Sequence, residues 1–155
     1  MGYIMDLRKE LPNPHRPIIM CSAGIVILDK EGRVLLQRRS DNKKWGLPGG
    51  SLELKESFEE AAIREAYEEV GLKIKSLQLF NVYSGEKCYN KYPNGDEIYN
   101  ASAIFISNDY EGEVTLDGDE SLEAIFFKKE DIPELNEINP PDRVVIENII
   151  EKLEG

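Results

Sequence analysis

The chain has 155 residues, of which 41% are hydrophobic and 32% charged, and these proportions are typical of one globular domain spanning residues 1–155. The net charge of −11 argues against a long nucleic acid as partner, because an acidic surface repels a polyanion on average. No apolar run approaches the roughly 20 residues of a membrane-spanning helix, and the charged, proline-containing start lacks the apolar core of a signal peptide, so we expect a cytoplasmic protein without a membrane partner.

The first fifty residues predict a lead-in segment, two strands and a loop. Residues 1–16 read as the lead-in. The apolar, β-branched run over residues 18–28 predicts a buried strand, and residues 34–39 predict a second strand after a glycine-containing turn. Residues 40–50, with the sequence SDNKKWGLPGG, predict a loop because glycine and proline interrupt regular structure.

A helix is predicted next, with clear signals at both ends. Ser57 and Glu60 fit the S-x-x-E capping box at its start. Gly71 is a natural residue to follow the last helical position, Val70, because glycine adopts left-handed backbone angles easily.

The second half of the chain predicts four strands and a final helix. Asn94-Gly95 indicates a tight hairpin between two of the strands. The strands are expected over residues 75–83, 97–107, 111–116 and 123–127, and the helix begins near Pro141. Strands, a helix, more strands and a helix together indicate the α/β class, a mixed sheet with helices packed on its faces.

The predicted helix carries three glutamates in an arrangement that ordinary structure does not favour. Glu65, Glu68 and Glu69 are spaced i, i+3 and i+4 and therefore share one side of the helix. Glu69 projects beside the expected apolar stripe, which consists of Phe58, Ala62, Ala66 and Val70. A divalent cation with oxygen ligands, such as Mg²⁺, would neutralise such a cluster. The alternative is a set of solvated surface glutamates that only graze the core.

The residues around these glutamates form a longer pattern. From Gly50 to Leu72 the chain reads G-x5-E-x7-R-E-A-x-E-E-x-G-L, which resembles the Nudix box of the Nudix hydrolases. Ala66 departs from the pattern, which has a bulky aliphatic residue there. The matching positions are Gly50, Glu56, Arg64, Glu65, Glu68, Glu69, Gly71 and Leu72. The resemblance implies a Nudix-type α/β/α sandwich with a mixed β-sheet.

The resemblance also implies roles for individual residues. Metal ligands would be Glu65, Glu68, Glu69 and the carbonyl of Gly49, holding Mg²⁺ or Mn²⁺ as its substitute. Glu56 and Arg64 would pair and, with Gly50, support the loop beside the helix; the alternative for that pair is an ordinary surface salt bridge.

The expected chemistry is hydrolysis of a phosphoanhydride, which needs a carboxylate to take a proton from the attacking water. Candidates within the helix are Glu65 and Glu68. The segment DGDESLE offers Asp119, Glu120 and Glu123, of which we select Glu120, although a solvated acidic turn explains that segment equally well.

Two arginines are candidates for binding the phosphates. Arg38 and Arg39 point to opposite faces of their predicted strand, so that one would face the substrate and the other solvent; Arg39 is the first choice. Trp45 could cover a base, but a core position suits it better.

The substrate class stays open at this point. The resemblance allows nucleoside triphosphates, ADP-ribose-like sugar nucleotides and dinucleoside polyphosphates, all of them small nucleotide-like molecules. The rival readings are a catalytically silent nucleotide-binding module of the same fold, an isoprenyl diphosphate isomerase and an RNA-end hydrolase. The presence of one histidine argues against the isomerase, and the acidic charge against a long RNA. A homodimer is left open.

Overall fold

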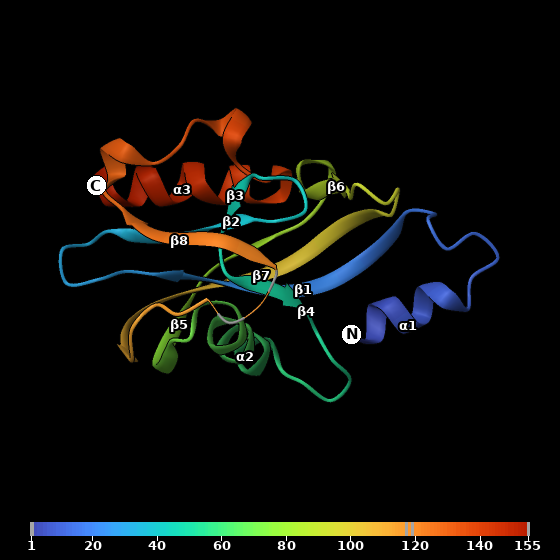
Figure 1. Cartoon of the computed structure of the whole chain (residues 1–155), viewed down its shortest axis with the longest axis horizontal. Helices are drawn as coiled ribbons and strands as arrows, with labels where there is room; N and C mark the ends of the chain where they lie inside the picture. The colour runs from blue at the N-terminus through green and yellow to red at the C-terminus, as the bar shows by residue number, and fades with distance from the viewer. Residues whose placement is uncertain (1, 117, 119, 155) are drawn as a thin grey trace.

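The computed structural model describes residues 2–116, 118 and 120–154, and its strands lie between helices on two sides (Figure 1). A five-stranded sheet has the order β4-β1-β7-β5, with β6 also paired to β7. These strands are β1 (Ile18–Ile27), β4 (Gly49–Ser51), β5 (Lys73–Tyr83), β6 (Tyr89–Lys91) and β7 (Glu97–Glu111). A three-stranded sheet has the order β3-β2-β8, with β2 (Val34–Arg39), β3 (Trp45–Gly46) and β8 (Ser121–Phe127).

The helices are α1 (Tyr3–Lys9), α2 (Phe58–Val70) and α3 (Arg143–Glu154), and short 3₁₀ turns occupy Glu86–Cys88, Lys129–Asp131, Leu135–Glu137 and Pro140–Asp142. Figure 1 shows α2 and α3 on opposite sides of the strands. None of the helices that the structure describes is long and apolar enough to cross a membrane.

β1 is the strand that joins the two halves of the core. It pairs in parallel with β7 and antiparallel with β4, so the large sheet is mixed. Ile25 and Ile27 pack in the cluster that contains the buried face of α2, whereas Val26 packs in the cluster that contains α3. A strand buried on both faces needs apolar residues at successive positions, which explains the continuous apolar run of this segment. The α/β class with helices on both faces is confirmed.

α2 begins and ends where the sequence predicts. The amide of Glu60 donates to the Ser57 hydroxyl at 3.0 Å, and the amide of Ser57 donates to the Glu60 carboxylate at 2.9 Å, which completes the capping box. Gly71 follows Val70 with φ of 73°, in the left-handed region that a residue with a side chain rarely adopts. The ends of the helix are therefore fixed locally.

Three predicted boundaries are wrong. The lead-in contains the helix α1, and the predicted loop 40–50 contains β3 and the start of β4. The strand predicted over 111–116 does not form, because β7 continues to Glu111 and Gly112, with φ of 99°, then turns the chain out of the sheet. Thr115 instead donates its amide to the carbonyl of Val70 at 2.9 Å, which satisfies the end of α2.

The apolar stripe of α2 differs from the prediction at one position. Phe58 is 38% exposed, and Ala61 is buried in its place beside Ala62, Ala66 and Val70. Phe58 is the first residue of the helix, and the buried face begins one turn later at Ala61.

Candidate functional site

One cavity of about 550 Å³ collects most of the residues that the sequence singles out. It lies where α2 faces β4 and the end of β2, and the segment that leads into β8 closes one side. The predicted site residues that line it are Arg39, Gly49, Gly50, Glu65, Glu69 and Glu120. Residues as far apart in the chain as Arg39 and Glu120 therefore meet around one space.

Glu65 and Glu69 lie side by side on the face of α2 that borders the cavity. One oxygen of Glu69 accepts hydrogen bonds from the Gly49 amide at 3.1 Å and from the side-chain amide of Gln37. Burial raises the pKa of Glu69 well above its ordinary value, and the neighbouring charge of Glu65 raises it further. Burial also raises the pKa of Glu65, although Arg64 opposes the change. The two carboxylates are thus poorly compensated by the protein alone.

The two glycines of β4 are required by contacts rather than by unusual backbone angles. A Cβ atom on Gly50 would overlap the carboxylate of Glu65. A Cβ atom on Gly49 would overlap the backbone of Ala23 in β1, to which β4 is paired. The absence of side chains therefore allows β4 to lie directly against both its partner strand and the carboxylates of α2.

Arg64 holds the loop before α2 against the helix, as the sequence predicts for its pair with Glu56. Its guanidinium donates to the two oxygens of Glu56 at 2.6 and 2.9 Å and to the carbonyl of Ser51 at 3.2 Å. The same group donates to Glu65 at 2.6 Å. Glu56 is the largest cause that raises the pKa of Arg64, and Arg64 in turn lowers the pKa of Glu56. Arg64 is fixed by its two-point pairing with Glu56 and in turn orients Glu65, one of the cavity carboxylates.

Glu68 takes a different position from the other two glutamates. Its side chain is 56% exposed and lies 3.3 Å from Arg64. It lines a neighbouring hollow of about 410 Å³ together with Glu69, Glu120 and Ser121. Among residues 2–116, 118 and 120–154, no three acidic, histidine or cysteine side chains converge in the geometry of a metal site. Glu65 and Glu69 are therefore the close pair, and Glu68 would have to turn from Arg64 to join them.

The two candidate arginines lie on different sides of β2, and the structure separates them. Arg39 lines the cavity and donates to the carboxylate of Asp41 at 2.8 and 3.0 Å. Arg38 does not line it; its guanidinium lies 3.3 Å from Glu123 of β8 and donates to the carbonyl of Lys43 at 3.1 Å. Of the two, only Arg39 is placed to contact a molecule in the cavity.

The structure also separates the acidic candidates at the start of β8. Glu120 lines both the cavity and the neighbouring hollow, so it lies near Glu69 and Glu68. Glu123 pairs with Arg38 away from the cavity. Asp119 lies outside the described residues. Trp45 packs edge-to-face against Phe127, with ring centroids 5.0 Å apart, which agrees with a core position.

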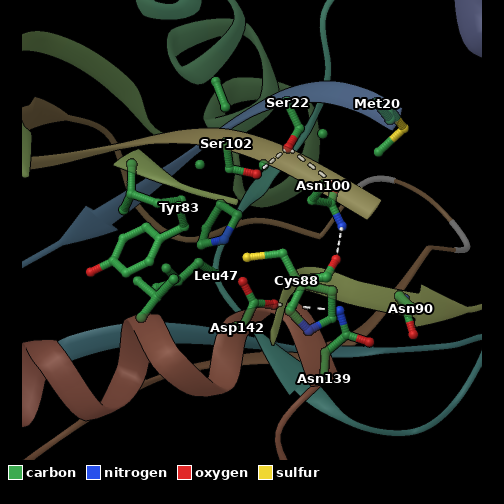
Figure 2. Close-up of a pocket in the computed structure, with 18 of the residues that line it drawn as sticks. Met20, Ser22, Leu47, Tyr83, Cys88, Asn90, Asn100, Ser102, Asn139 and Asp142 are labelled. Atoms are coloured by element: carbon green, nitrogen blue, oxygen red, sulfur yellow. Dashed lines mark hydrogen bonds between the residues drawn. The ribbon is translucent and has the colours of Figure 1, made fainter. Parts of the chain in front are cut away.

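A second, smaller pocket adjoins the cavity, and the sequence alone does not reveal it. It has a volume of about 90 Å³ and shares Met20, Arg39, Gly49, Gly50 and Tyr92 with the first. Figure 2 shows the polar side chains that face this space, which come from β1, β6, β7 and the turn before α3. They are Ser22, Asn90, Asn100, Ser102, Asn139 and Asp142.

The polar groups of this second pocket are close to one another and poorly solvated. Ser22 donates to Asn100 at 3.2 Å, and Asn100 donates to the carbonyl of Cys88 at 3.5 Å. Burial raises the pKa of Asp142 to about 6, although Arg39 opposes the change. Polar residues at inward positions of apolar strands, such as Ser22 and Asn100, are the sequence signal that could have indicated this pocket.

Comparison with known proteins agrees with the fold and the motif. Residues 20–149 match the family model described as NUDIX domain. The chain is 38% identical over 112 residues to an ADP-ribose pyrophosphatase of Methanocaldococcus jannaschii, across 70% of this chain and 62% of that protein. It is 42% identical over 79 residues to a MutT-like protein of Streptomyces ambofaciens, across 51% of this chain and 50% of that protein.

A solved structure, the MutT NUDIX hydrolase from Burkholderia pseudomallei, is similar with a TM-score of 0.69 and 25% identity, across 84% of this chain and 97% of that one. The aligned region spans about half to three fifths of the length of the two sequence relatives. Because the family model covers most of the chain, including α2 and the strands that line the cavity, the chain belongs to the NUDIX domain family.

Proposed function

We propose that this protein is a Mg²⁺-dependent hydrolase that cleaves the phosphoanhydride of a nucleoside diphosphate linked to a second moiety. The observation that carries the proposal is the pair of partly buried carboxylates, Glu65 and Glu69, on the wall of a cavity large enough for a nucleotide. Membership of the NUDIX domain family and relatives named as pyrophosphatase and MutT-like support it.

The residues present fit a hard divalent cation. Burial raises the pKa of both Glu65 and Glu69, and the charge of Glu65 raises the pKa of Glu69 further. A cation with oxygen ligands would therefore relieve an existing cost. Glu65, Glu69, Glu68 and the Gly49 carbonyl would hold Mg²⁺, with Mn²⁺ as a substitute. When bound, the metal would offset phosphate charge and lower the pKa of a bound water.

The residues of this chain would then position the substrate and accept a proton. Arg39 would bind a phosphate oxygen, because it lines both the cavity and the second pocket. Arg64 would keep Glu65 in place through their 2.6 Å contact. The proton from the attacking water would go to Glu65, Glu68 or Glu120, each of which borders the cavity or the adjoining hollow.

A substrate with two moieties is favoured by the shape of the site. The cavity and the second pocket meet at Arg39, Gly49 and Gly50, so a diphosphate at that junction could extend one group into each space. ADP-ribose-like molecules and dinucleoside polyphosphates have this form. ADP-ribose is the first choice because the Methanocaldococcus jannaschii relative is named for it.

The test compares two glutamates of the same helix. Glu69→Gln keeps the oxygen that accepts from Gly49 but removes the charge, whereas Glu59→Gln makes the same change at an exposed position in the first turn. With Mg²⁺ and a panel of ADP-ribose, diadenosine polyphosphates and nucleoside triphosphates, we expect Glu69→Gln to lower kcat/KM by about a hundredfold or more, and Glu59→Gln to leave it within about twofold. Chelation of the metal should abolish turnover by the wild type.

The stability of the same variant separates loss of function from loss of fold. Without metal, Glu69→Gln should melt a few degrees above wild type, since removal of a half-buried, uncompensated charge stabilises the fold by about 1 kcal/mol. Mg²⁺ should raise the Tm of wild type but not of the variant. If the wild type binds ADP-ribose but turns over no member of the panel, the hydrolase proposal is wrong and the protein is a silent nucleotide-binding module.

A further inference from the structure

The N-terminal helix α1 (Tyr3–Lys9) lies outside the part of the chain that matches the family model, residues 20–149, yet it forms one wall of the cavity. Ile4 and Met5 are half-buried and line the same space as Glu65 and Glu69. In Figure 1, α1 lies to the right of α2, below the start of β1. The site therefore includes a wall from outside the region that matches the family model.

Arg8 anchors this helix to the rest of the protein. Its side chain is buried, at 5% exposure, and its guanidinium donates to the carbonyls of Pro14 at 2.6 Å, Arg16 at 3.0 Å and Glu97 at 2.7 Å. Its Nε lies 3.5 Å from the carboxylate of Asp96. Because these four oxygens engage most of its five N–H groups, Arg8 chiefly holds α1 in place.

Both ends of the segment are fixed as well. The amide of Tyr3 donates to the carboxylate of Glu53, in the loop between β4 and α2, at 3.2 Å. His15 Nδ1 lies 2.6 Å from Asp96, and the amide of Glu97 donates to the carbonyl of His15 at 3.3 Å. These contacts attach α1 to the loop that leads into α2 and to the start of β7. α1 is therefore a fixed part of the cavity wall.

The wall at α1 differs in chemistry from the wall at α2. Ile4 and Met5 are accompanied by four further apolar or aromatic residues that line the cavity, Met20, Tyr92, Pro93 and Ile98. Arg8 also lines the cavity, but it is 5% exposed and its guanidinium already donates to three backbone carbonyls. A terminal phosphate placed against this wall would therefore lose more hydration than it regains in hydrogen bonds. The C–H face of a sugar ring would fit well, because methionine and isoleucine side chains pack closely against apolar surfaces.

We propose that α1 determines substrate specificity: Ile4 and Met5 contact the group attached to the β-phosphate and favour a ring there over a terminal phosphate. Arg8 is a positioning residue that acts through the helix. This inference rests on the proposed function and deepens it, since it assigns to one wall the choice between ADP-ribose and ATP. These two molecules share ADP and differ only in the group that the wall would contact.

The kinetic test replaces the wall and leaves the helix in place. Ile4→Ser combined with Met5→Ser is compared with Tyr3→Ser, which is on the same helix but 41% exposed and not part of the cavity lining. We expect the double variant to raise KM for ADP-ribose about tenfold, with kcat changed less than twofold and with no change in KM for ATP. Tyr3→Ser should match wild type on both.

A second measurement does not depend on turnover. The chain has three methionines, so a protein labelled with ¹³C at the methionine methyl groups gives few signals, and Met5→Leu identifies the one from Met5. With ADP-ribose and no added metal, the Met5 methyl should show contacts to protons of the terminal ribose. With ATP its signal should shift little.

The outcomes distinguish this inference from the proposed function. The proposed role of α1 would be wrong if the double variant changed KM equally for both nucleotides, or if the Met5 methyl showed no contacts to the ribose. Either result would stand even if wild type hydrolyses ADP-ribose. Contacts at Met5 without hydrolysis of any nucleotide by wild type would support the wall and overturn the hydrolase.

Discussion

Single residues of this site show how burial and charge oppose each other. Glu69 and Asp142 are both half-buried acids with a raised pKa, but their surroundings differ. Glu69 has another carboxylate, Glu65, beside it, which is the situation that a cation relieves. Asp142 has the cation Arg39 near it and lines the polar second pocket. The first acid is thus suited to a metal, and the second to a hydrogen-bonding role.

Asp142 gives a prediction for the pH dependence of stability. Its pKa is about 6 in the folded protein against an ordinary 3.8, so the folded state keeps a proton that the unfolded chain loses between these values. The free energy of unfolding should therefore fall as the pH rises through this window, by up to about 3 kcal/mol. Asp142→Asn removes that fall.

Urea unfolding of wild type and Asp142→Asn should give similar stabilities near pH 4 and a clear advantage for the variant at pH 7. A constant difference between the two proteins over this range would mean that the pKa of Asp142 is not raised by folding.

Among the secondary-structure elements, α2 carries both the chemistry and much of the local order. It begins with the capping box of Ser57 and Glu60 and ends at Gly71, and its small residues Ala62 and Ala66 allow it to approach β1 closely. Small side chains on the buried face bring the adjacent Glu65 and Glu69 near β4. A helix with bulky residues at these positions would hold the carboxylates farther from Gly49 and Gly50.

The cap of α2 can be tested by one substitution. Ser57→Ala removes the hydroxyl that accepts from the Glu60 amide, and we expect a loss of about 1 kcal/mol, equivalent to a Tm lower by about 2–4 °C. The same change at Ser84, which is exposed and outside a helix, should alter the Tm by less than about 1 °C. A Tm unchanged in Ser57→Ala would indicate that packing alone fixes the start of the helix.

The whole molecule is held together by β1, which contributes to the cores on both sides of the sheet. Ile25 is completely buried in this strand, whereas Ile19, on the same strand, is 77% exposed. The parallel pairing with β7 extends over the full length of β1 and places both residues in the same ladder. The two isoleucines therefore differ in burial and share their backbone environment.

This pair provides a matched test of the core. Ile25→Ala should lower the free energy of unfolding by about 2–5 kcal/mol, because it removes apolar contacts and leaves a cavity. Ile19→Ala should change it by less than about 0.5 kcal/mol. Chemical denaturation of the two variants measures the difference, and similar losses would show that β1 is not buried as the fold requires.

Whether the chain forms a homodimer stays a prediction, for which sedimentation is the direct measurement.

The sequence by itself determined the features that depend on neighbours along the chain. A continuous apolar run identified β1, alternation along the chain identified β2, and the capping residues fixed both ends of α2, because these signals act over a few neighbouring positions. The spacing of Glu65, Glu68 and Glu69 with Arg64 and Gly50 identified the family for the same reason. The end of β7 was missed, since strand length depends on pairing with a partner distant in sequence.

Only the tertiary structure decided which distant residues share a space. It placed Arg39 in the cavity and Arg38 beside Glu123, a choice that strand alternation leaves open. It also gathered asparagines from three separate segments around the second pocket and brought α1 to the cavity through Arg8. The physical reason is that burial and hydrogen bonding between remote segments follow from how the sheets and helices pack, which no local pattern records.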